Sequence, residues 1–211
     1  MKASTRNAAM KAAIALALAA TPLLASAESS INSGSGSPLT TSARLDFQIT
    51  IPKVLFLQVG AGTNMAANAT INQIAFSVPA ANIGDDTVVN ATAGSGDLGN
   101  GQVTAKVIGN NGTITFTSTT AGALGNGSGD TISYADIATA VAANTSATPL
   151  AHPALADAAT TTVTLTPASG KVINRDAKWT YTYLNTAVAA PGTYGGVNTN
   201  NSRVTYTASM P

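Results

Sequence analysis

Apolar and polar residues alternate most clearly between positions 43 and 51. The apolar positions are Ala43, Leu45, Phe47, Ile49 and Ile51, with a polar residue between each pair. This period of two puts the two kinds of side chain on opposite faces of an extended strand. Pro52 ends the pattern, because proline cannot donate a hydrogen bond to a ladder. The pattern predicts a strand with one apolar face.

Shorter alternating or apolar runs recur along the rest of the chain. They predict strands at 53–59, 74–78, 102–108, 113–118, 131–134, 163–165, 178–184 and around Val204 and Tyr206. An Asn/Gly turn at 109–112 joins two of these runs, and we expect a β-hairpin there. Only 136–143 favours a helix, with Ser133 as its N-cap. The spacing of turns predicts an all-β fold, a sandwich or barrel of antiparallel strands with Gly/Asn-rich loops and at most one short helix.

The first 42 residues precede these strand patterns. Residues 1–27 combine basic residues, a short apolar run and the small residues Ala25 and Ala27, which predicts a cleaved secretory signal peptide. The apolar run is too short for the alternative, a transmembrane anchor. The Ser/Gly-rich stretch 28–42 predicts a flexible N-terminal arm, and 43–211 a single sandwich domain.

Composition and charge narrow the function. Charged residues make up 9% of the chain, and cysteine is absent. Beyond residue 27, seven basic and nine acidic residues give a net charge of −2. No basic patch remains for nucleic acid, because phosphate binding requires clustered positive charge. The predicted signal peptide, with which this composition agrees, leads us to expect an exported protein found in the periplasm, at the cell surface or fimbrium, or outside the cell.

Candidate sites for chemistry are few. His152 stands in a Pro/Ala-rich segment without other histidines or cysteines for zinc, and we expect an exposed loop residue. Asp85 and Asp86 are adjacent, which favours a solvated turn over the two positioned carboxylates of a glycosidase. The stretch 125–133 is similar to one copy of a calcium-binding nonapeptide, but a glycine-rich loop explains it equally well. We expect neither an enzyme nor a cofactor.

Aromatic residues concentrate near the C-terminus. Trp179, Tyr181 and Tyr183 share one face of a predicted strand, and Tyr206 lies on the last one. A core position is favoured over a sugar-stacking surface, because the chain has few other bulky residues with which to fill a core.

The layout resembles bacterial fimbrial proteins. The shared features are the signal sequence and arm, the strand at 43–51 running through Pro52 into 53–59, and the ending at 178–184, 191–194 and 203–208. Pilins of the chaperone–usher type are Ig-like sandwiches that lack one strand and receive it from a neighbour's N-terminal extension. The chain departs from that pattern, since it has no disulfide, no aromatic next to the C-terminus and no glycine about fourteen residues before the end.

The resemblance implies an Ig-like antiparallel β-sandwich with Gly/Asn-rich loops and at most one short helix. It also implies a structural surface subunit or adhesin that assembles by strand complementation. Its partners would be copies of itself or other surface subunits, and a periplasmic chaperone. The assembly strand would carry Ala43, Leu45, Phe47, Ile49 and Ile51. The alternative is a monomeric secreted module that binds a carbohydrate or surface ligand through loops near Asn110, Gly125 or Tyr194.

Overall fold

The computed structural model describes residues 28–211. The expected signal peptide, residues 1–27, lies outside this part. The chain divides into a unit that ends at Ile51 and a compact unit, Pro52–Pro211. The compact unit thus begins nine residues after position 43, the start expected from the sequence.

The described part of the first unit, 28–51, contains no helix or strand, so the strand predicted at 43–51 is wrong. The physical reason is that no neighbouring backbone in the described part of the chain pairs with this segment. Arg44 forms a bidentate ion pair with Glu28, with Nε and Nη2 at 2.7 and 2.8 Å from the two carboxylate oxygens. The Asn32 side chain also donates to the Thr40 carbonyl oxygen at 3.0 Å. These contacts bring residues far apart in the segment together, so it doubles back on itself between Glu28 and Arg44.

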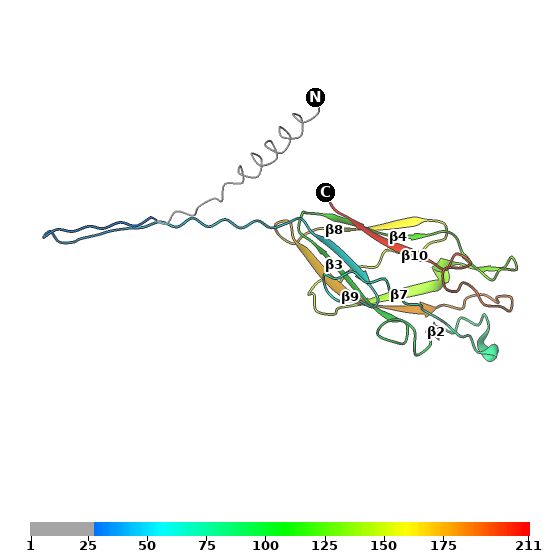
Figure 1. Ribbon diagram of the computed structural model, residues 1–211. Helices are drawn as coiled ribbons and strands as arrows, with labels where there is room; N and C mark the ends of the chain where they lie inside the picture. Colours follow the sequence, from blue (N-terminus) through cyan, green and yellow to red (C-terminus); the bar gives the residue numbers. More distant parts are fainter. Residues whose placement is uncertain (1–27) are drawn as a thin grey trace, which may run out of the picture. The chain divides into compact units, whose positions relative to one another are not determined.

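The compact unit consists of antiparallel sheets (Figure 1). The larger sheet holds five strands, β1 (Leu55–Val59), β3 (Gln102–Gly109), β9 (Ile173–Tyr183), β2 (Val89–Asn90) and β7 (Ile137–Ala142). The smaller has the order β10 (Val204–Ser209), β4 (Ile114–Thr120) and β8 (Thr160–Leu165). A two-stranded ribbon pairs β5 (Leu124–Gly125) with β6 (Thr131–Ile132), and two 3₁₀ turns are η1 (Ala80–Asn82) and η2 (Tyr134–Asp136).

The core lies between the two main sheets. Every second residue of β3 is buried, from Val103 to Gly109, as expected of strands with one face against a core. Phe116 on β4 stacks on Trp179 on β9 with ring centroids 6.0 Å apart. Trp179 is fully buried, and its Nε1 donates to the Leu150 carbonyl oxygen at 2.9 Å. The all-β antiparallel fold is therefore confirmed, and its Ig-like form stays a prediction.

The expected hairpin at 109–112 is wrong, although both of its strands exist. β3 pairs with β1 and β9, whereas β4 pairs with β10 and β8. The turn therefore carries the chain from one sheet to the other. The physical reason is that β3 and β4 each have an apolar face, and these faces meet across the core when the strands lie in opposite sheets.

Two other local predictions were also wrong. The segment 136–143 forms strand β7 on β9 instead of a helix, and Ser133 caps only the 3₁₀ turn η2 by accepting from the Ala135 N–H. At 74–78 the structure has a single bridge, between Phe76 and Ala91, in place of a strand. Within residues 28–211, no helix is long and apolar enough to cross a membrane.

Candidate functional site: an apolar groove beside two open sheet edges

The site is built by the outer strands β1 and β10. Each ends its sheet, so within the described residues each is paired on one side only, β1 with β3 and β10 with β4. The two strands also contact each other. An unpaired strand edge exposes a row of N–H and C=O groups that can accept another strand. Two such edges therefore lie close together on the compact unit.

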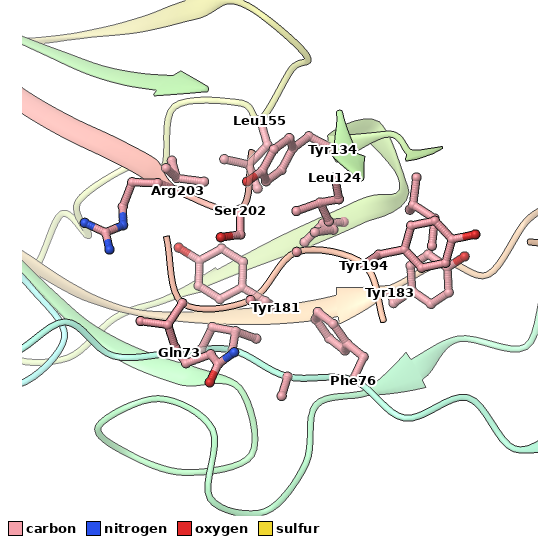
Figure 2. Close-up of a pocket in the computed structure, with 18 of the residues that line it drawn as sticks. Gln73, Phe76, Leu124, Tyr134, Leu155, Tyr181, Tyr183, Tyr194, Ser202 and Arg203 are labelled. Atoms are coloured by element: carbon pink, nitrogen blue, oxygen red, sulfur yellow. The ribbon is translucent and has the colours of Figure 1, made fainter. Parts of the chain in front are cut away.

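An apolar cavity of about 1090 Å³ opens beside these strands. Its lining includes Leu57 and Val59 from β1, Ile74 and Phe76 from the irregular segment before β2, and Tyr206 from β10. Figure 2 shows the aromatic rings of Phe76, Tyr181, Tyr183 and Tyr194 gathered around it. We call this cavity the groove. Its lining is mostly apolar. Covering these side chains would remove apolar surface from water, which lowers the free energy.

Hydrogen bonds hold the irregular wall of the groove in place. The Ala75 N–H donates to Ser95 Oγ at 3.0 Å, and the Thr92 N–H donates to the Ala75 carbonyl oxygen at 2.8 Å. At the other end of the wall, the Ala61 N–H donates to Asn72 Oδ1 at 2.7 Å. The segment 72–76 is therefore anchored to neighbouring loops without being a strand, and it leaves β1 with a free edge.

A polar triad lies under the groove. His152 Nε2 is 2.7 Å from the Tyr206 hydroxyl oxygen and 3.1 Å from that of Tyr181, and the two hydroxyl oxygens are 3.0 Å apart. The imidazole also packs edge-on against Trp179, with centroids 4.6 Å apart. The expectation of an exposed loop histidine is wrong, because His152 is half-buried among the core aromatics.

The triad is uncharged at neutral pH. Burial lowers the pKa of His152 to about 4 and raises the pKa of Tyr181 to about 12. Burial also raises the pKa of Tyr206, as does the neighbouring Tyr181. Removing a charged group from water favours its neutral form, which explains the three directions. The floor of the groove at Tyr181 and Tyr206 is therefore neutral, while the charged Arg203 also lines the groove.

The predicted assembly residues fall in the unit that ends at Ile51, and they are exposed. Phe47 is 85% and Ile49 84% accessible, and Leu45 and Ile51 are exposed as well. Ala43 is also exposed, and no residue from 43 to 51 has a ladder partner in the described part of the chain. The segment therefore exposes four large apolar side chains to solvent, and its backbone hydrogen-bonding groups have no ladder partner in the described residues.

The predicted core aromatics are found in the core. Trp179, Tyr181 and Tyr183 are buried, and Tyr206 is partly buried against the same cluster. Tyr181, Tyr183 and Tyr206 also line the groove, so one set of rings serves both core and site.

The other sequence candidates form no centre for chemistry. Asp85 accepts hydrogen bonds from the Asn82 side chain and the Thr87 N–H, as in an ordinary turn. Asp130 is held by the Asn126 side chain at 2.8 Å within the glycine-rich loop. In residues 28–211 no group of three or more His, Asp or Glu side chains is placed to hold a metal ion.

Sequence reasoning missed the groove and its floor. Alternation of Val204, Tyr206 and Ala208 with hydroxyl residues on β10 was the available signal for a half-buried edge. His152 had no comparable signal, because its Pro/Ala-rich surroundings resemble a loop and its partners are at least 29 residues away. Three-dimensional packing alone brings it to Tyr181 and Tyr206.

Comparison with protein-family models, curated protein sequences and solved structures found no match to this chain. Its function is therefore argued from the groove and the strand pattern.

Proposed function

We propose that this chain is a structural subunit of a bacterial surface fibre, of the pilin or fimbrial kind, that assembles by strand complementation. The observation that carries the proposal is a match within one chain. The compact unit has an apolar groove beside two unpaired strand edges, and the segment 43–51 has an unpaired backbone and an exposed apolar face. The groove and the open edges lack a covering strand, and the segment lacks both a backbone partner and an apolar surface against which to bury its side chains.

The energetics favour joining the two. An added strand would pair its backbone with an open edge and insert alternate side chains into the groove. Burying Leu45, Phe47, Ile49 and Ile51 would contribute on the order of 5–10 kcal/mol at about 25 cal/mol per Å² of apolar surface. Ordering the nine residues costs about 1–2 kcal/mol each and offsets this gain. The backbone hydrogen bonds along the open edge, at about 0.5–1.5 kcal/mol each, must therefore supply the rest of the stabilisation.

The charge of the chain fits the same role. Beyond residue 27 the net charge is only −2, so neighbouring copies in a stack would repel each other weakly. Fimbrial assembly also agrees with the secretory signal peptide predicted at residues 1–27. A periplasmic chaperone would be expected to cover the groove before assembly.

The test places charge on one face of the segment. In the chain from Glu28 to Pro211, we compare F47D/I49D with the matched control Q48D/T50D, which adds the same charge to the polar face. The apolar-face variant should stay monomeric, because a carboxylate cannot enter an apolar groove without a large desolvation cost. The control should assemble like the wild type. Size-exclusion chromatography, negative-stain microscopy and SDS-resistant ladders report assembly.

The alternative is a monomeric binding module. It is favoured by Tyr183 and Tyr194, which line the groove together and could hold a ligand. A wild-type chain that remains monomeric, with no difference between the two variants, would reject the fibre proposal in favour of this one.

A further inference from the structure

One side chain fixes the chain where the compact unit begins. Asn110, in the turn between β3 and β4, donates from Nδ2 to the Pro52 carbonyl oxygen at 2.7 Å and accepts at Oδ1 from the Val54 N–H at 2.8 Å. Its own backbone N–H donates to the Val54 carbonyl oxygen at 3.3 Å. Three hydrogen bonds from one residue hold the three residues Pro52–Val54.

These bonds continue the β1–β3 ladder. The last pair of that ladder is Leu55 with Gly109, and the backbone bond between Asn110 and Val54 is the next step outward. The Asn110 side-chain amide takes the place of a backbone there, since its oxygen accepts from the Val54 N–H and its NH2 group donates to the Pro52 carbonyl oxygen. Pro52–Val54 are thus tied to the β3 side of β1, in extended continuation of the strand.

The direction in which Pro52–Val54 runs matters because the groove has two candidate occupants, the 43–51 segment of the same chain and that of another copy. Only residues 52–54 separate the segment 43–51 from β1. If they formed a tight turn, the segment would fold back as a hairpin on the open edge of its own β1 and fill its own groove. Such a turn would have to break the bonds to Asn110, because Pro52 and Val54 could no longer both face it.

Resting on the proposed function, we infer that Asn110 is a positioning residue that makes the groove accept a strand from a second copy and not from its own chain. The intramolecular strand would otherwise be favoured, since a short connection gives it a high effective concentration. Asn110 removes that advantage by opposing the turn. The occupant of the groove is therefore the 43–51 segment of another molecule.

The test uses the chain from Glu28 to Pro211 and a fluorescent peptide with the sequence of residues 43–51. Asn110→Ala removes the two side-chain hydrogen bonds and should raise the monomer share at a fixed chain concentration by about thirtyfold, the shift that loss of two ordinary hydrogen bonds produces. Its monomer fraction should take up about thirtyfold less peptide than the wild-type monomer, because its own segment occupies the groove.

Two further variants make the result decisive. Asn111→Ala perturbs the same turn but loses a bond to the Pro211 carbonyl oxygen instead, and it should behave like the wild type. N110A/F47D/I49D should regain peptide uptake, which would show that the variant folds and that its own segment had blocked the groove.

The outcomes separate the two proposals. Assembly and peptide uptake by N110A equal to those of the wild type would overturn the inference and leave the fibre proposal standing. A wild-type chain that neither assembles nor takes up the peptide would overturn the fibre proposal, and the inference with it.

Discussion

His152 is held in its neutral form by its surroundings. Its folded-state pKa is about 4, below the value of about 6.5 for an unfolded chain. Between these values the unfolded chain binds more protons, so the free energy of unfolding decreases as the pH falls. We expect a loss of about 2 kcal/mol between pH 7.5 and pH 5, from about 1.4 kcal/mol per pKa unit. Chemical denaturation at the two pH values measures it.

His152→Gln provides the control, because glutamine does not titrate and can still bond to the tyrosine hydroxyls. Its unfolding free energy should depend on pH much less between pH 7.5 and pH 5 than that of the wild type. An equal dependence in both proteins would mean that other groups cause the loss.

Asp176 anchors the loop that covers the core. It is buried on β9, and its Oδ1 accepts from the N–H groups of Thr145 and Ser146 at 2.9 and 2.8 Å. Burial by itself would raise the pKa of Asp176, but hydrogen bonds from Thr145 and Ser146 outweigh it and hold that pKa well below its ordinary value. The carboxylate is thus a fixed structural charge.

Asp176→Ala should lower the free energy of unfolding by about 2–4 kcal/mol, since it removes the hydrogen bonds from Thr145 and Ser146 to a charged acceptor. Asp176→Asn keeps one oxygen acceptor and should lose less. Thermal and urea unfolding of the two variants provide the comparison. Equal losses would show that volume at this position, and not hydrogen bonding, stabilises the loop.

At the scale of the element, a period of two located most strands of the compact unit but not their partners, and the clearest alternation, at 43–51, forms no strand. Alternation at 102–108 and 113–118 located β3 and β4 closely. The turn between them resembles that of a hairpin, yet it joins two sheets. Sequence spacing shows which face of a strand is apolar, whereas the neighbour of that strand depends on distant segments such as β9 and β10.

The error at 136–143 has a similar origin. Alanine-rich sequence has high helix propensity, but the segment lies beside the exposed backbone edge of β9. Six ladder pairs with residues Lys178–Tyr183 outweigh the local preference. Only part of the site was predictable. The apolar face at 43–51 follows from the alternation in the sequence, whereas the groove depends on tertiary packing between distant segments.

At the scale of the whole molecule, the sheets leave an unfilled position. β1 and β10 are terminal strands that contact each other, and the cavity beside them is lined by side chains that also belong to the core or pack against it. A core that remains open at one side forgoes part of the burial that stabilises a domain of this size. Stability and assembly should therefore be linked in this protein, because the same contact closes the core and joins two copies.

This linkage predicts that an added strand will stabilise the chain. We expect the peptide of residues 43–51, at one hundred times its Kd, to increase the free energy of unfolding of F47D/I49D by about 2.7 kcal/mol, since it binds only the folded state. For a domain of this size the melting temperature should rise by about 5–10 °C. The same peptide carrying aspartate in place of Phe47 and Ile49 is the matched control and should have no effect. Differential scanning calorimetry distinguishes the cases, and equal shifts with both peptides would mean that binding does not depend on filling the groove.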